Sequence, residues 1–488
     1  MRFARLVPTL LLATGLADGE ADPPEFLRVS EALANTRGIE ADLRALCDGI
    51  GSRMAGTPGM RRALNWAVRE FVEAGLPNAR LEAVPMPLSW SEGPTQIEAL
   101  EPAAFPVRAA ASALSPPFRQ TEDAELVYGG TGQPGYIARS RERFRGRILL
   151  VRLDQAGSFN ELAVEQRDAM IAVREAEDAG ARAVLLISTR PNRLLYRHVN
   201  TVTGTLDGIP SAVVAREDGL RMLRLLQEGS KVRVRVEMPN RIGPAYETAN
   251  VVADLPGVDL PDEVVLMGAH LDSWDMGTGC LDNAANAALV MNVAREIVAS
   301  GLRPRRTLRF VLFGGEELGL FGSRAYVSRH RADLDGHVAV IVHDMGSGPL
   351  LGYSVGGRKE LIAKLRPLID AASLPGKLRL SDDPFLLSDN FTFMLQGVPS
   401  LFALQDTSEF FLTYHSEADS FDKVGIADLT DTARIAAEML LGISESESRF
   451  ADRWSETQVA DWMRGAGLVR HLRFLGVWDA WRPAPRPE

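Results

Sequence analysis

Histidine and carboxylate side chains follow the ends of three apolar runs in this chain. They are His270 after the run 264–269, Glu316 and Glu317 after the run 307–313, and Asp344 near the end of the run 337–346. Short apolar runs rich in Val, Ile, Leu and Phe predict buried strands. Sites in open α/β sheets are built at the carboxyl ends of strands, so we expect these side chains to share one sheet edge.

These residue types suit a hydrolytic metal centre. Such a centre needs nitrogen and oxygen ligands, an open position for water, and a nearby carboxylate that takes the proton of that water. Asp272, two residues after His270, is expected to hold the imidazole through its second ring nitrogen. Asp282 precedes a predicted helix over 283–300 and could bridge two cations, while His415 lies in an acid-rich loop and would complete the ligand set.

The adjacent glutamates point to opposite sides of the local backbone, so they can take different roles. We assign Glu317 to the metal and Glu316 to base catalysis. An isolated Glu-Glu pair is more often a solvated loop or the first turn of a helix. The Phe-Gly-Gly sequence that joins this pair to an apolar strand favours the site instead.

Other residues near these segments have two open interpretations. Tyr414 could donate a hydrogen bond to an oxyanion or could simply pack beside the loop of His415. Trp274 and the segment 388–391 are candidates for lining a substrate site. The remaining histidines are interpreted as surface or core residues: His198, His330, His337, His343 and His471.

At these motifs the chain resembles the di-zinc exopeptidases, a family that includes bacterial leucyl aminopeptidase, aminopeptidase Y and carboxypeptidase Q. Ala269 to Asp275 matches the Gly-His-Leu-Asp-Ser-Trp-Asp pattern of the carboxypeptidase Q members with one change, Ala269 for glycine. The segment 46–56 resembles the opening of the mature domain in those members. The likeness extends from about Leu43 to Ile443.

The resemblance implies a role for each position. One zinc would be held by His270 and Asp344, the other by Glu317 and His415, and Asp282 would bridge both. Glu316 would be the base and Asp272 the partner of a ligand. After Asp282 the chain reads Asn-Ala-Ala-Asn, where relatives commonly carry Asn-Ala-Ser-Gly or a run of glycines.

The composition excludes several classes of protein. With 488 residues and 46% hydrophobic content, the chain can bury more than one core and is not disordered. A net charge of −10 argues against a nucleic-acid or anionic-membrane partner and leaves small solutes. With only two cysteines, Cys47 and Cys280, packing and metal must provide stability, and Cys280 is interpreted as a small buried thiol.

The amino terminus has the layout of a secretory signal peptide. A basic start is followed by an apolar run too short to span a bilayer and by small residues, and we expect cleavage after Ala17. Apart from this signal segment, 1–17, no run approaches the length of a membrane span. The mature protein is expected to be exported and soluble.

Three further units are expected along the chain. Alternating strands and helices over 21–122 and 238–445 predict an α/β catalytic domain with a mainly parallel mixed sheet flanked by helices. The segment 123–237 interrupts it and resembles a protease-associated domain at 144–148 and 209–213. The segment 446–488 is expected to be a docked helical tail.

The predicted function is therefore a secreted di-zinc exopeptidase that acts on dipeptides or short peptides. Four alternatives compete with it: a glutaminyl cyclase-like acyltransferase with one zinc, a transferrin receptor-like ectodomain without ligands, a purely structural protein, and an endopeptidase. Carboxylate-rich bridged sites also accept cobalt or manganese. The resemblance further implies a homodimer, whereas the sequence does not indicate which peptide end is recognised.

Overall fold

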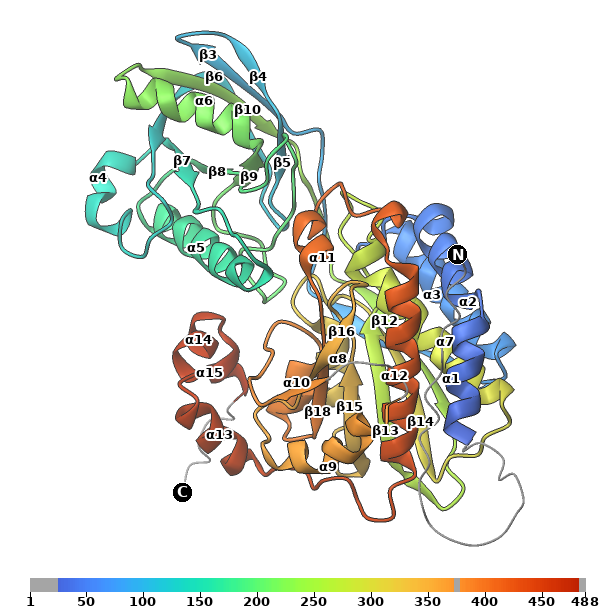
Figure 1. Ribbon diagram of the computed structural model, residues 1–488. Helices are drawn as coiled ribbons and strands as arrows, with labels where there is room; N and C mark the ends of the chain where they lie inside the picture. Colours follow the sequence, from blue (N-terminus) through green and yellow to red (C-terminus); the bar gives the residue numbers. More distant parts are fainter. Residues whose placement is uncertain (1–24, 373–377, 482–488) are drawn as a thin grey trace, which may run out of the picture.

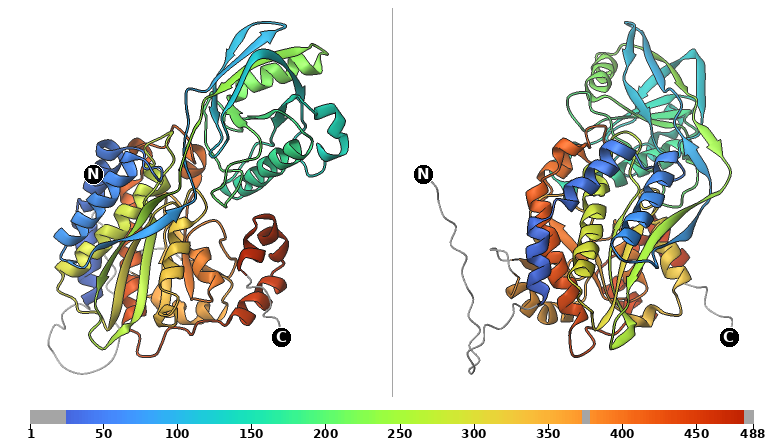
Figure 2. Two further views of the ribbon diagram at one scale, coloured as in Figure 1. Left: turned by 180° about the vertical axis from the view of Figure 1, so that it is seen from behind. Right: turned by 90° about the vertical axis from the view of Figure 1, so that its right-hand side faces the viewer.

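The computed structural model describes residues 25–372 and 378–481, and it contains two eight-stranded sheets, each with its own helices (Figure 1). Figure 2 shows the same two bodies from behind and from the side. The predicted signal peptide, 1–17, lies outside the described residues. Among the described helices, none is long and apolar enough to cross a lipid bilayer.

The first sheet carries the predicted site strands. Its order is β1-β12-β14-β13-β15-β18-β16-β17, and the four central strands from β14 to β18 are parallel. The strands are β1 (Arg80–Met86), β12 (Tyr246–Leu255), β13 (Leu260–His270), β14 (Arg306–Phe313), β15 (His337–Val342), β16 (Leu350–Ser354), β17 (Arg379–Ser381) and β18 (Ser400–Gln405). The predicted α/β fold with a mixed sheet is confirmed.

Helices cover both faces of this sheet because side chains alternate along each strand. On β14, Leu308 and Phe310 belong to one core and Val311 and Phe313 to the other. The first core is covered by α1 (Glu25–Asn35), α2 (Gly38–Arg44), α3 (Pro58–Glu73), α7 (Ala285–Ala299), α9 (Glu360–Asp370) and α12 (Ile426–Ser444). The second is covered by α8 (Phe321–Arg329) and α10 (Asn390–Leu395).

Local sequence explains where two of these helices begin. Helix α3 begins at Pro58 because the Thr57 hydroxyl caps it by accepting a hydrogen bond from the backbone N–H of Met60. The helix expected from residue 283 is α7, and most of its residues are buried. A helix that is apolar on most sides is expected in a core of this size.

The second sheet has the order β4-β3-β10-β6-β7-β8-β9-β5. Its strands are β3 (Gln96–Glu101), β4 (Phe105–Val107), β5 (Ala109–Ala111), β6 (Phe118–Tyr128), β7 (Ile148–Arg152), β8 (Ala183–Ile187), β9 (Ser211–Val214) and β10 (Val232–Met238). Helices α4 (Arg141–Phe144) and α5 (Phe159–Asp178) lie on one face, and α6 (Arg216–Gln227) lies on the other.

The boundary expected at residue 123 falls inside β6 and is too late for this sheet, which takes strands from Gln96 onward. The chain enters and leaves the sheet through a two-stranded ribbon, β2 (Ser89–Ser91) paired with β11 (Arg241–Gly243). The strands β3 to β5 are short and carry no continuous apolar run, so periodicity does not reveal that they belong here.

The described part of the chain ends in three helices, α13 (Glu456–Gly465), α14 (Val469–Phe474) and α15 (Val477–Trp481). Ser455 caps α13 in a capping box with Gln458. Met463, Leu472 and Trp478 from this segment form a small core with Phe391 of α10. Its described residues therefore form a helical tail that packs against the first body.

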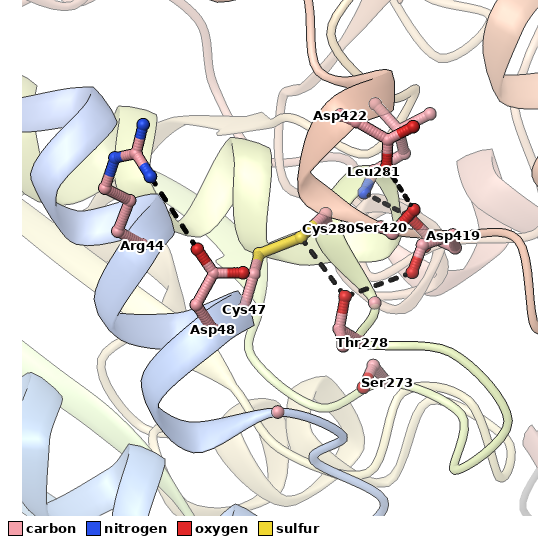
Figure 3. The surroundings of a disulfide bond; sticks show 12 residues. Arg44, Cys47, Asp48, Ser273, Thr278, Cys280, Leu281, Asp419, Ser420 and Asp422 are labelled. Carbon is pink, nitrogen blue, oxygen red and sulfur yellow. Dashed lines mark hydrogen bonds and ion pairs between the residues drawn. A yellow bond between two sulfur atoms is a disulfide. The ribbon is translucent and has the colours of Figure 1, made fainter.

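Cys47 and Cys280 form a disulfide, so the interpretation of Cys280 as a free buried thiol is wrong (Figure 3). Their Cα atoms are 5.8 Å apart although 233 positions separate them in the sequence. Cys47 lies in the helical turn η1 (Ala45–Ile50) and Cys280 in the turn η3 (Cys280–Ala284). Only the packing of α2 and η1 beside η3 brings the two sulfurs together, and no sequence pattern reports that packing.

Candidate metal centre

The five predicted ligands form two groups that share Asp282. His270, Asp282 and Asp344 offer ligand atoms that lie within 4.8 Å of one another, and so do Asp282, Glu317 and His415. His270 Nε2 is 3.1 Å from Asp282 Oδ1 and 3.1 Å from Asp344 Oδ1. His415 Nε2 is 3.3 Å from Asp282 Oδ2 and 3.1 Å from Glu317 Oε2. Each oxygen of Asp282 thus faces a different group.

Parallel strands bring the first part of this set together. His270 pairs in register with Phe313, the last residue of β14, so the loop that carries the glutamates begins beside His270. Gly268 pairs with Val342 at the end of β15, which places Asp344 at the same sheet edge. This confirms the expectation that the strand ends converge.

Asp282 and His415 come from irregular backbone. Asp282 lies in η3 with non-helical dihedral angles of φ −122° and ψ 87°, and the Asp282–Asn283 peptide bond is cis. His415 follows α11 (Ser408–Thr413) and has a φ of 57°, in the left-handed region that non-glycine residues rarely adopt. Both side chains are buried.

Two residues that sequence reasoning missed hold the η3 segment. The Asp419 carboxylate accepts a hydrogen bond from the backbone N–H of Leu281 at 2.7 Å (Figure 3). It accepts a second from the backbone N–H of Asp282 at 3.0 Å. The fully buried Arg53 donates to the backbone carbonyl oxygens of Leu271, Thr278 and Gly279, and also to that of the nearby Gly51. Arg53 lies in the segment 46–56 that carries part of the resemblance, which is the only sequence signal for its role.

Asp272 acts differently from the expectation. His270 Nδ1 lies 3.0 Å from the backbone carbonyl oxygen of Asp272, whereas the Asp272 Oδ1 is 3.7 Å away. The carboxylate instead accepts hydrogen bonds from the backbone N–H groups of Glu316 and Glu317. Asp272 therefore orients the imidazole through its backbone and the glutamate pair through its side chain.

Several buried carboxylates lie close together in the site, and they shift the pKa values of the ligand residues. Burial outweighs all other effects on Glu317 and raises its pKa to about 7. Burial alone would lower the pKa of His415, but the Glu317 and Asp282 carboxylates raise it to about 9. Burial likewise opposes a charged Asp282, yet hydrogen bonds from both ligand histidines hold its pKa below the ordinary value.

Glu316 is buried beside these ligands but belongs to neither group of three. Burial raises its pKa well above the ordinary value, and the nearby carboxylates of Asp344, Glu317 and Asp389 act in the same direction. The side chain lines a cavity next to Glu317 and His415. A carboxylate in this position can exchange a proton with a molecule in the cavity.

His198, interpreted from the sequence as a surface or core residue, is a buried residue that contacts the candidate site. Its Nδ1 lies 2.9 Å from the Nδ1 of the candidate ligand His415. Burial, followed by the charge of His415, lowers the pKa of His198 well below its ordinary value, so His198 is neutral and can accept a hydrogen bond. A residue of the second sheet body therefore contacts a candidate metal ligand.

The loop of His415 is also fastened to the second body by other bonds. The backbone N–H of Arg197 donates to the carbonyl oxygen of His415 at 2.9 Å, and Arg108 pairs with Glu417 at 2.6 Å. On the other side, the ring of Tyr414 stacks on the His415 imidazole with 3.6 Å between centroids. The ligand is thus held from several directions.

A cavity of about 100 Å³ opens beside the candidate site. Its walls come from the glutamate loop and α8, from α5 of the second body, and from the C-terminal helices α14 and α15. Phe391 of the segment 388–391 lines it, as expected, and Tyr414 lines it too. Ser388, Asp389 and Asn390 are instead buried, and Trp274 lines a smaller space behind Asp282 and His415.

Comparisons with known proteins show which proteins this chain is similar to. Residues 250–440 match the model of Peptidase family M28. Carboxypeptidase Q of Mus musculus is 28% identical over 384 residues, which cover 78% of this chain and 79% of that protein.

Two solved structures share the fold. The Peptidase M28 precursor from Shewanella amazonensis has a TM-score of 0.77 at 23% identity and covers 88% of this chain and 98% of its own. BSAP, a zinc aminopeptidase from Bacillus subtilis, has a TM-score of 0.66 at 18% identity, with 86% and 98% covered. The chain is therefore a carboxypeptidase Q-like exopeptidase whose residues 250–440 form a domain of Peptidase family M28.

Proposed function

We propose that the chain is an exported di-zinc exopeptidase that hydrolyses dipeptides or short peptides. The proposal rests above all on Asp282, because its two carboxylate oxygens face separate groups of buried ligand atoms. Export is supported by the N-terminal sequence pattern and by a disulfide, which is typical of an oxidising compartment.

The donor set fits two zinc ions. Zinc is bound by imidazole nitrogen and carboxylate oxygen, and each group provides one histidine and two carboxylates when Asp282 is counted in both. Glu317 Oε1 is buried and accepts no hydrogen bond from any described residue, as expected for an oxygen that awaits a cation. Zinc in these groups would polarise the scissile carbonyl and make a water molecule more acidic.

The residues of the chain complete the reaction. The Glu316 carboxylate takes a proton from the attacking water and later returns it to the leaving amine. Its burial supports this role, since a raised pKa makes a carboxylate a stronger base. Tyr414 donates a hydrogen bond to the carbonyl oxygen as negative charge develops there. Asp272 holds the backbone of Glu316 in position.

The size of the cavity supports a short substrate. One water molecule needs about 10–15 Å³ of such space, so the cavity holds roughly seven to ten water-sized groups, about one or two residues. The wall that α5 and the C-terminal helices add encloses the site on two sides. We assign the second body to a protease-associated domain that roofs the site, and we propose a homodimer on the resemblance alone.

The competing functions explain less. A glutaminyl cyclase-like enzyme needs one zinc, and a transferrin receptor-like ectodomain needs none, yet all five ligands are present in two groups. A structural protein would not require several buried acids beside a cavity. An endopeptidase needs an open cleft for a long chain, whereas this cavity is small.

Metal analysis and a substrate panel test the proposal together. We expect about two zinc ions per chain by mass spectrometry, and hydrolysis of unblocked dipeptides such as alanyl-leucine. N-acetylated dipeptides in the same panel show whether a free amino end is required. A purified, zinc-supplied protein that binds no metal, or that hydrolyses none of these peptides, contradicts the proposal.

A further inference from the structure

The cavity beside Glu316 has an uneven charge. Apart from Glu316 and Glu317, which belong to the metal centre, no described residue of its lining carries a carboxylate. Apart from the candidate ligand His415 and the phenol of Tyr414, its other ionisable groups are Arg167, Arg324 and His471, set among apolar side chains. Beyond the metal centre, the cavity therefore suits a ligand with an apolar body and a negative end.

The three basic groups are not equivalent. Arg167 pairs with Asp168, with 2.8 Å between Nη2 and Oδ1. Burial lowers the pKa of His471, followed by repulsion from Arg167, so its imidazole is neutral at pH 7. Arg324 differs from both because, among the residues that the structure describes, no carboxylate lies within ion-pair distance of it.

Arg324 is nevertheless held in place. It lies on α8, directly after the glutamate loop, and is partly buried. Its Nη1 donates to the backbone carbonyl oxygen of Val202 at 3.2 Å, and its guanidinium lies 5.9 Å from the ring centroid of Phe321. One bond to a carbonyl leaves most of its five N–H donors available. A partly desolvated, uncompensated guanidinium in a substrate cavity is typical of a carboxylate-binding site.

We propose that Arg324 binds the free α-carboxylate of the peptide's C-terminal residue, so that the enzyme recognises its substrates by their carboxyl end. This inference rests on the proposed function and names the substrate class of that site. The leucines and phenylalanines of the cavity wall would surround the apolar side chain of the same residue: Leu320, Leu386, Leu387, Phe391, Phe474 and Leu475.

The dimensions agree with a dipeptide or a peptide cut one residue from its end. An extended residue spans about 3.3–3.6 Å, so the carboxylate of the leaving residue lies close to the scissile bond. Glu316 and Arg324 line the same small cavity. In this proposal Glu316 acts at the scissile bond and Arg324 binds the C-terminal carboxylate. Preferred substrates therefore end in an apolar residue with a free carboxylate.

Binding without turnover tests the inference separately from the peptidase activity. In the Glu316→Gln protein, loaded with zinc, we would measure binding of alanyl-leucine and alanyl-leucinamide by titration calorimetry. The two ligands differ only in the charge of the C-terminal group. The binding of both ligands is then measured in two further proteins, in which Glu316→Gln is combined with either Arg324→Met or Arg324→Lys. Arg329→Met is the matched control, because Arg329 is exposed on the same helix and faces Glu82 instead.

We expect the free carboxylate to bind roughly 10- to 100-fold more tightly than the amide, as charge-assisted hydrogen bonds allow. Arg324→Met should abolish this preference while it leaves amide binding nearly unchanged, Arg324→Lys should restore part of it, and Arg329→Met should keep it. Equal binding of the two ligands to the parent, or a preference that survives Arg324→Met, overturns the inference. Hydrolysis by wild type tests the proposed function independently, because these binding measurements involve no turnover.

Discussion

At the scale of single residues, neighbours in the sequence have separate tasks. Glu316 and Glu317 are adjacent, and Asp272 accepts a hydrogen bond from the backbone N–H of each. Only Glu317 lies in a group of ligand atoms, at 3.1 Å from His415 Nε2. The direction of a side chain, rather than its chemical type, therefore decides which of the two glutamates lies in a group of candidate ligands.

The two glutamates provide a matched pair of variants. Glu316→Gln should lower kcat by about 10²- to 10⁴-fold, since it removes the base, and should keep the full zinc content. Glu317→Gln should instead lower the zinc content, because it removes a ligand. Steady-state kinetics with alanyl-leucine and metal analysis of both proteins distinguish the roles. If Glu316→Gln lost zinc or kept full turnover, the assignment of the base would be wrong.

Asp282 gives a second prediction at this scale. Because each of its oxygens faces a different group, Asp282→Asn should weaken both sites, whereas Asp344→Asn should weaken only one. Zinc titration should then show no tight site in the first variant and one tight site in the second. Two tight sites in Asp282→Asn would contradict a bridging role.

At the scale of elements, the candidate site depends on segments that are far apart in sequence. The strand ends of β13, β14 and β15 supply four of the residues, but the loop of His415 is held by the second body through Arg197, Arg108 and His198. The second sheet is thus part of the support of a ligand as well as a wall of the cavity.

His198→Ala should reduce zinc affinity by about 10- to 100-fold, because it removes the group that accepts the hydrogen bond of His415. Competition with a chromogenic chelator measures the affinity directly, without reference to activity. His330→Ala is the control, since His330 pairs with Glu82 away from the candidate site. An unchanged zinc affinity in His198→Ala would show that the contact does not support the ligand.

The disulfide joins η1 to η3, two positions before Asp282. The double variant Cys47→Ser, Cys280→Ser should lose about 2–5 kcal/mol of unfolding free energy, because the bond closes a long loop in the unfolded chain. Urea denaturation gives this difference. Reductant should lower the unfolding free energy of wild type to that of the variant and leave the variant unchanged. If reductant did not change the unfolding free energy of wild type, the expectation would be refuted.

Much of the ligand set follows from local sequence, because His270, the glutamates and Asp344 each come directly after an apolar run. Contacts across the fold are not visible in this way. His198 and His415 are 217 positions apart, and both belong to irregular segments whose packing no periodicity reports. The same holds for the disulfide, and for β3 to β5, which are too short to stand out from loops.

At the scale of the whole molecule, the acid cluster links metal binding to stability. Asp282, Asp344, Glu316 and Glu317 lie together in a buried region, and burial opposes a charge on each of them. Cations would offset this repulsion only in the folded protein, where the ligands converge. Removal of metal should therefore affect folding and not activity alone.

Dialysis against a chelator should lower the melting temperature, and added zinc should restore it. A ligand at 100 times its dissociation constant stabilises the folded state by about 2.7 kcal/mol, so the shift should be several degrees. Differential scanning fluorimetry measures it, with Asp282→Asn as the control that should respond weakly. If zinc raised the melting temperatures of wild type and Asp282→Asn equally, the stabilisation would not arise at the candidate site.

The pairing of β1 with β12 also sets the order in which a newly made chain can become active. Met86 pairs with Tyr246, so the ribosome must finish the entire second sheet before the edge of the first can close. His415 is made later still, near the end of translation. A nascent chain that has not yet reached residue 415 therefore cannot form both groups of candidate ligands, even when its first strands are already made.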